Sequence, residues 1–350
     1  MSELRNANRN RDHIRRQLLA TVSIGVLLAA ISTAVEADDG SSDRAPIWIE
    51  LGGQFAGDQN PHQAFLSPFI PAAQPPFEII SPAEVEKPAS TSLDGSAKIS
   101  FEPVGTDWIF SAGVTFGRSG RNQFLRQMTQ QPDQGTHGVY VAYQNVTSKI
   151  TQSHAILDFS AGKDVGLGGI NSSINLGVRY VQFTTKSDAL IQSQPTNVGF
   201  FHPYHRINAH LLADRKFTGV GPSLSWDASA AIIGNHNNGE IAIDWGVNGA
   251  VLFGRQSIRG HHQTTNVYYT YYYSKSHHRY SAPLNRSKQV TVPNVGGFAG
   301  LSWRYPNAKV SVGYRADFFF GAMDGGIDTA HRENVGFYGP FASVSVGLGG

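Results

Sequence analysis

Cysteine is absent from this chain of 350 residues. Without a thiol there is no disulfide framework, no thiolate metal site, no cysteine nucleophile and no cysteine on which a lipid anchor could be built. Any metal or covalent chemistry would have to use other residue types.

Charge is also scarce, since Asp, Glu, Lys and Arg make up only 15% of the residues, against 40% hydrophobic residues and 38 glycines. This composition is unlike that of a helical bundle. Five arginines fall before residue 38, and residues 38–350 contain as many basic as acidic side chains. No Lys/Arg stripe follows them, so no nucleic-acid partner is predicted.

Sequence motifs of enzymes are missing as well. There is no Gly-x-Ser-x-Gly elbow, Walker loop, His-Glu-x-x-His helix or dinucleotide fingerprint. Of the 13 histidines, only His154 lies on a strand expected below. Six others form pairs outside the strands, at His202 and His205, His261 and His262, and His277 and His278. Pairs in separate loops do not define a metal site. We expect no enzymatic activity, no cofactor and no metal.

The first 37 residues have the pattern of an export signal. Arginines from Arg5 to Arg16 precede an apolar run from Leu18 to Val35, and Val35-Glu36-Ala37 is a small-residue cleavage site. We predict a cleaved secretory signal peptide at 1–37 and an exported protein at 38–350. Two alternatives are a twin-arginine signal at Arg15-Arg16 and an uncleaved anchor, because the run is about as long as a spanning helix requires.

The exported part alternates between apolar and small or polar residues with a period of two. In 309–320, for example, Val310, Val312 and Tyr314 share one face, and Ser311 and Gly313 share the other. A helix would scatter such a pattern around its whole surface. The pattern predicts an all-β, transmembrane, antiparallel up-and-down β-barrel of about ten strands, at 47–56, 96–104, 108–118, 153–165, 173–184, 217–229, 240–255, 294–305, 309–320 and 338–348.

The expected connections alternate between long and short. The long ones are 57–95, 119–152, 185–216, 256–293 and 321–337, as expected for five extracellular loops opposite short periplasmic turns. Segment 57–95 contains seven prolines and is predicted to be a long irregular loop that constricts the lumen or covers the barrel mouth. Within the His/Tyr-rich loop 256–293, residues 266–280 are predicted either to continue the strands above the membrane or to form a binding surface.

Aromatic residues mark both ends of the expected strands. They lie at Trp108, Trp303 and Tyr305 beside the short turns and at Phe116, Phe253, Phe318 and Phe320 at the opposite ends. Two aromatic girdles at the membrane interfaces would have this distribution. The alternative is ordinary core packing.

Four segments carry a family resemblance. "KVSVGYRADFFFGAMDGGID" from Lys309, "GFYGPFASVSVGLGG" from Gly336, "INLGVRYVQF" from Ile174 and "FTGVGPSLSWDA" from Phe217 resemble strands of the Legionella-type major outer-membrane porin family. The resemblance covers about a quarter of the exported chain and implies a single-chain, pore-forming barrel. The ending Leu348-Gly349-Gly350 departs from the terminal aromatic residue of many outer-membrane barrels.

The same alternation assigns charged side chains to the lumen. The predicted pore-lining residues, which share their face with Glu50 and Asp227, are Lys98, Glu102, Asp158, Arg179, Asp244, Arg304, Arg315 and Asp317. Such a polar conduit would set ion preference, whereas mutual pairing of the same residues would form a plug. We expect an outer-membrane porin for passive diffusion of small hydrophilic solutes or ions.

Two alternatives to a porin are kept. One is a non-conducting structural or adhesion barrel whose extracellular loops bind surfaces or partners, and the other is a secreted soluble β protein. The predicted partners are outer-membrane lipid, the barrel-assembly machinery and the solutes themselves. The oligomeric state stays open between a single barrel and a homo-oligomer.

Overall fold

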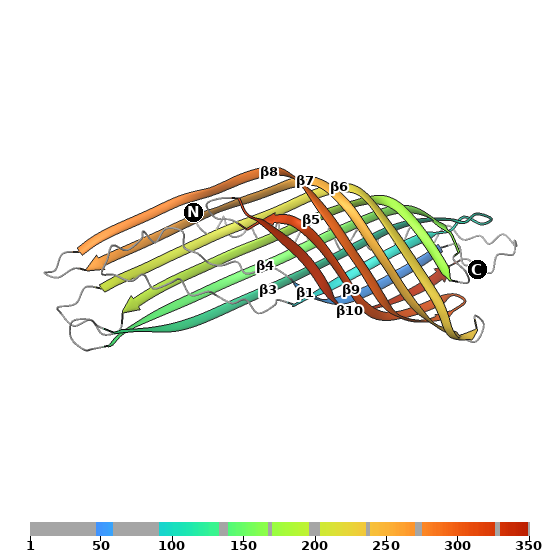
Figure 1. Ribbon diagram of the computed structural model, residues 1–350, viewed down its shortest axis with the longest axis horizontal. Coiled ribbons are helices and arrows are strands. Elements are labelled where there is room, and N and C mark those ends of the chain that lie inside the picture. Colours follow the sequence, from blue (N-terminus) through green and yellow to red (C-terminus); the bar gives the residue numbers. More distant parts are fainter. Residues whose placement is uncertain are drawn as a thin grey trace, which may run out of the picture. The chain divides into compact units, whose positions relative to one another are not determined.

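The computed structural model describes residues 47–58, 91–132, 139–166, 170–195, 204–235, 239–269, 275–325 and 330–348. These residues form a closed antiparallel barrel in which each strand pairs with its neighbours in sequence (Figure 1). The strands are β1 (Ile47–Asp58), β2 (Thr91–Phe101), β3 (Trp108–Pro132), β4 (Val139–Asp164), β5 (Asn171–Pro195), β6 (Tyr204–Asn235), β7 (Gly239–Tyr269), β8 (Lys275–Tyr305), β9 (Ala308–Asp324) and β10 (Arg332–Leu348).

The predicted fold class is confirmed, and each predicted strand overlaps an observed one. Alternation produces the two faces directly: Val344 in β10 is 50% exposed on the outside, whereas its neighbour Ser345 is 5% exposed and faces the interior. β10 pairs with β1 from Ile47↔Leu348 to Asp58↔Phe337. This pairing removes the open sheet edge that the first and last strands would otherwise leave.

The predicted long loops 119–152 and 185–216 are wrong, because their described residues continue the strands. For 256–293 the alternative of continued strands is the one that the described residues show. β3 and β4 pair without a break from Trp108↔Lys163 to Pro132↔Val139, and β7 and β8 pair from Glu240↔Arg304 to Tyr269↔Lys275. Segments 119–152, 185–216 and 256–293 are therefore mostly strand. The cause is a change in which face is apolar: on the extension of β6 the buried Ala209, Leu211 and Ala213 face inward and polar residues face outward, the reverse of the pattern inside the apolar band.

The other predictions about connections have different outcomes. The short turns are confirmed, since β8 ends at Tyr305 and β9 begins at Ala308, and Gly105 supplies a positive φ in the turn after β2. Segment 321–337 is shortened by β9 and β10. In the predicted loop 57–95 the first two and last five residues belong to β1 and β2, and 59–90 lie outside the described residues, as does the predicted signal peptide 1–37. Among the described residues, no helix is long and apolar enough to span a membrane.

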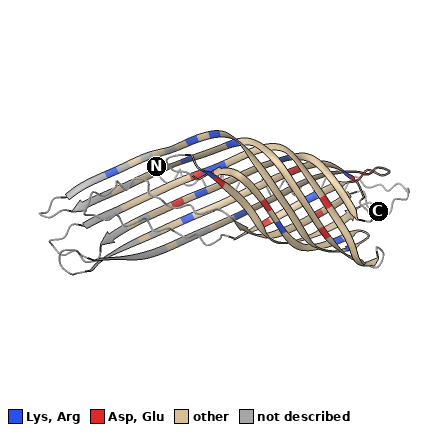
Figure 2. Ribbon diagram, in the orientation of Figure 1, with Lys and Arg blue, Asp and Glu red and all other residues tan. Residues whose placement is uncertain are grey.

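An apolar band surrounds the outside of the barrel. On β7 the outward side chains from Ile241 to Phe253 are mainly large, apolar and exposed, and the next outward residue is Arg255. On β3 the band runs from Trp108 to Phe116 and ends at Arg118. Figure 2 shows charged residues along the whole described part of the barrel, and outside the apolar band they include outward side chains such as Arg118 and Arg255. The band spans about ten residues of each strand, the length that a tilted strand needs to cross hydrocarbon.

Exposed aromatic rings lie at both margins of the apolar band. They are Trp108, Trp303 and Tyr305 at the margin beside the short turns, and Phe116, Phe253 and Phe320 at the other. Their exposure excludes ordinary core packing for these six rings, as expected for two aromatic girdles.

The interior is narrow. Paired residues can be traced from strand to strand, starting at Val114 on β3. Through β4 to β7 the trace reaches Thr291 on β8, and through β2, β1, β10 and β9 it reaches Trp303, twelve residues further along β8. This stagger tilts the strands. Barrels of about eight strands are just filled by their own side chains, so one of ten strands leaves little free space.

Candidate functional site

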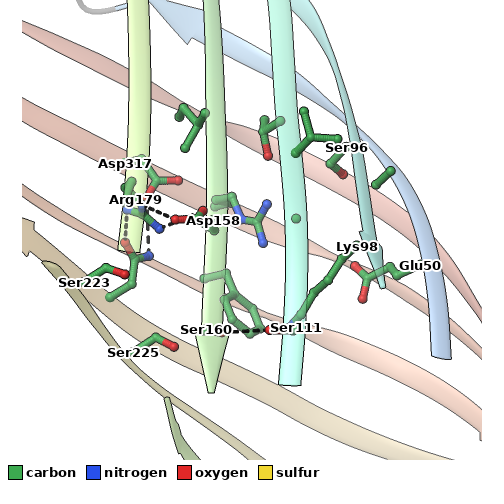
Figure 3. Close-up of a pocket in the computed structure, with 18 of the residues that line it drawn as sticks. Glu50, Ser96, Lys98, Ser111, Asp158, Ser160, Arg179, Ser223, Ser225 and Asp317 are labelled. Atoms are coloured by element: carbon green, nitrogen blue, oxygen red, sulfur yellow. Dashed lines mark hydrogen bonds and ion pairs between the residues drawn. The ribbon is translucent and has the colours of Figure 1, made fainter. Parts of the chain in front are cut away.

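A polar cavity of about 180 Å³ lies inside the half of the barrel near the short turns. Figure 3 shows its wall, where Lys98 and Glu50 project from adjacent strands and Arg179 points at Asp158. Its charged lining residues are Glu50, Asp94, Lys98, Asp158, Arg179, Asp227, Arg315 and Asp317. Serine hydroxyls and amides complete the wall, so the cavity suits water or a small hydrophilic molecule.

Arg179 joins four strands across this cavity. Its Nε donates to Asp158 Oδ1 at 2.6 Å on β4, and its Nη1 donates to Asn248 Oδ1 at 2.7 Å on β7 and to the Asn294 side chain on β8. Nη2 donates to the second Asp158 oxygen at 3.2 Å. Asn248 in turn donates to Asp317 at 3.4 Å on β9. Because Arg179 itself is buried, its charge depends on these partners.

A second network lies nearer the short turns. Asp244 contacts Arg304, accepts a hydrogen bond from Ser229 Oγ at 2.7 Å, and lies 2.7 Å from Lys309 Nζ. Arg304 also reaches Glu240 at 3.9 Å. Acids and bases are therefore paired here, which is the mutual pairing that would favour a plug.

Of the eight predicted pore-lining residues, seven project into the barrel. Lys98, Asp158, Arg179, Arg315 and Asp317 line the cavity, and Asp244 and Arg304 form the second network. Arg315 lies over two rings, with its Cζ 5.8 Å from the Phe298 centroid and 5.6 Å from that of Phe341. Glu102 follows the end of β2 at Phe101, so it belongs to the turn rather than to a strand.

An aromatic layer fills the barrel beyond the cavity. Phe183 on β5 lies 4.9 Å from Phe319 on β9, 5.7 Å from Phe337 on β10 and 6.0 Å from Phe217 on β6, measured between ring centroids. All four rings are between 0% and 8% exposed. β5 and β10 lie on opposite sides of the barrel, so these contacts cross its full width. Val181, Leu252 and Val292 pack in the same cluster.

His154 completes this layer on β4. Its ring centroid lies 4.0 Å from that of Phe337, and its Nε2 lies 3.3 Å from Asp94 Oδ2 on β2. Ser92 Oγ donates to the other Asp94 oxygen at 2.6 Å. Sequence alternation already placed His154 on a strand but gave no indication of a buried acid opposite it. Asp94 was missed because β2 begins at Thr91, five residues before its predicted start.

Beyond the layer, a polar cluster occupies the part of the interior enclosed by the strand extensions. Arg286 Nε donates to Asp324 Oδ2 at 3.0 Å, and Arg215 Nη2 donates to the Gly325 carbonyl at 3.4 Å. Burial lowers the pKa of the Arg215 guanidinium, and the nearby carboxylates of Glu333 and Asp324 oppose this effect. These charges balance one another inside the wall.

The histidine pairs are not all outside the strands, as the sequence had suggested. His261 and His262 lie within β7 and point to opposite faces, His261 outward beside Ser281 Oγ at 2.9 Å and His262 buried inside. His205, His277 and His278 also belong to strands, whereas His202 lies outside the described residues. The described part of the chain contains no group of three His, Cys, Asp or Glu residues that could hold a metal ion.

Comparisons with known proteins add little. No protein-family model matches the sequence, and no curated protein matches it significantly. Among solved structures, the chain is similar to the transport unit of the autotransporter AIDA-I from Escherichia coli, with 7% identity, coverage of 91% of this chain and 95% of that chain, and a TM-score of 0.26. At that TM-score the likeness carries no argument.

Proposed function

We propose that this protein is a β-barrel of the outer membrane of the Gram-negative cell envelope. The closed barrel and the apolar band of membrane-spanning width support this location, and so do the aromatic rings at both margins of the band. The predicted export signal at 1–37 agrees with it.

A basic residue in the middle of the apolar band tests this location. Val178 faces outward there, so Val178→Arg is expected to lower the free energy of unfolding in lipid vesicles by roughly 2–4 kcal/mol. Urea titration followed by tryptophan fluorescence measures the loss. Thr184→Arg, on the same face of β5 but beyond the band, is the control and is expected to cost less than about 1 kcal/mol. Equal losses of unfolding free energy in the two variants would contradict the proposal that the apolar band lies in a membrane.

Within this location, a non-conducting barrel is the function that the geometry supports best. The aromatic layer carries this proposal, because contacts between Phe183, Phe319 and Phe337 cross the lumen and place buried rings where a water path would have to run. The six long strands β3–β8 then provide a rigid extracellular wall for binding surfaces, partner proteins or polysaccharide.

The second candidate is the passive porin, and the polar cavity favours it. A purely structural barrel has no need for a cavity whose wall carries Lys98, Glu50 and Asp227. In this candidate the cavity is one half of a conduit, and the aromatic layer has to be displaced before solutes pass.

Single-channel conductance of the refolded protein in a planar bilayer tests the choice. We expect a correctly folded, inserted barrel without discrete current steps. Frequent steps with the wild-type chain would overturn the non-conducting proposal and favour the porin. The variant Arg315→Glu is then informative, because a shift in ion preference identifies Arg315 as part of the conduit wall.

A further inference from the structure

Six basic residues face outward just beyond the apolar band, on the side of the strand extensions. This group, here called the basic band, has exposed side chains and occupies five consecutive strands from β3 to β7; its members are Arg118, Lys149, Lys186, Lys216, Arg255 and Arg259. The outward acidic residues among them are Asp188 and Asp214. The basic band therefore carries a surplus of positive charge.

The register places three members of the basic band, Arg118, Lys216 and Arg255, nearest to the apolar band. Arg255 is the outward residue directly after Phe253, and Arg118 is the one directly after Phe116. Lys216 lies four residues beyond Val220 on β6, and its neighbours in register are Thr184 and Ser257. Lys149 and Lys186 lie farther out on β4 and β5, so the basic band is a zone several residues deep along the strands.

The residues of the basic band differ from the basic residues inside the barrel in their acidic partners. Inside, each of Arg179, Arg286 and Arg304 is held by a buried or half-buried aspartate. In the basic band, Lys216 pairs with Asp214 at 3.4 Å, but these side chains are 51% and 36% exposed. Exposed pairs of this kind contribute little and leave the lysine available to another anion.

We propose that the basic band binds phosphorylated headgroups of outer-leaflet lipid. This inference rests on the proposed insertion in the outer membrane. Headgroups lie just outside the hydrocarbon region, at the level where the outward residues change from Phe116 to Arg118 and from Phe253 to Arg255. Lys and Arg bind phosphate through charge-assisted hydrogen bonds, and anionic surfaces attract basic side chains placed beside them. The bound headgroups would then line the outside of the barrel along β3 to β7.

Titration of the full-length protein in neutral detergent micelles with fluorescently labelled lipopolysaccharide tests this proposal. The double variant Lys186→Gln/Lys216→Gln is expected to weaken binding about thirtyfold, because each basic residue beside an anionic surface contributes roughly fivefold. Lys98→Gln/Lys163→Gln is the matched control, since it removes the same charge from the cavity and from the opposite margin of the apolar band. The control is expected to bind like the wild type.

Three outcomes would overturn the proposal: equal weakening in both double variants, unchanged binding in the Lys186→Gln/Lys216→Gln variant, or equal affinity for lipopolysaccharide stripped of its phosphates. Competition by millimolar inorganic phosphate at the same site would assign the site to free phosphate and also overturn the proposal of lipid binding. Insertion into phosphatidylcholine vesicles is measured separately for each variant. A chain that fails to insert there contradicts the membrane location, whereas failure of the titration alone contradicts only the lipid site.

Discussion

Arg179→Met is expected to lower the free energy of unfolding by roughly 3–5 kcal/mol, because it leaves the Asp158 carboxylate without its buried cation. The change also removes the hydrogen bonds that Arg179 donates to Asn248 and Asn294, so β5 loses these links to β7 and β8 within the lumen. Urea unfolding of the refolded barrel in lipid vesicles measures the loss.

Two further variants identify the cause of the Arg179 effect. Lys98→Met changes the same charge in the same cavity at an exposed side chain, and is expected to cost less than about 1 kcal/mol. Adding Asp158→Asn to Arg179→Met removes the uncompensated charge, and is expected to recover part of the stability. A single Arg179→Met variant as stable as Lys98→Met would contradict a structural role for the network.

Phe183→Ala/Phe337→Ala is expected to turn a closed barrel into a conducting one. These rings make the contacts that cross the lumen, so their removal leaves a gap between the polar cavity and the interior of the extracellular wall. Discrete current steps in a planar bilayer are the expected result. Each truncation of a buried ring also costs roughly 3–5 kcal/mol, so the single variant Phe337→Ala is measured beside the double variant.

The control for the layer is a phenylalanine on the outer face. Phe253→Ala removes an exposed ring from the margin of the apolar band and is expected to leave the lumen closed. If a folded Phe183→Ala/Phe337→Ala barrel gives no current steps, the lumen is closed without these two rings, by Phe217, Phe319, Leu252 and Val292. Steps from the Phe253→Ala barrel would show that the currents do not depend on the layer.

The strands of the barrel fall into a long and a short group. Strands β3–β8 are 25 to 32 residues long, whereas β1, β2, β9 and β10 have 11 to 17 residues. Inward residues of the extensions, such as Ala209, Leu211 and Ile258, are buried. The wall formed by the strand extensions is therefore packed on its inner side and carries the basic band on its outer side.

Local sequence was sufficient to predict the part of the barrel that carries the apolar band. Alternation in 108–118, 240–255 and 309–320 decides which side chains face inward, because successive residues of a strand point to opposite faces whatever the strand pairs with. For this reason Asp158, Arg179 and Asp317 could be assigned to the interior before any strand pairing was known. The exposed rings Trp108 and Phe253 also followed from their places at strand ends.

Only the tertiary structure decided what those inward residues do. Arg179 meets Asn294 across 115 residues of sequence, and Phe183 meets Phe337 because the closing pair β1–β10 brings β10 opposite β5. Such contacts depend on strand number and stagger, which no local pattern encodes. The extensions of β3–β6 were missed for a related reason. Outside hydrocarbon a strand needs no apolar outer face, so on the β6 extension the buried Ala209 and Leu211 face inward, the reverse of the pattern that identified the strands.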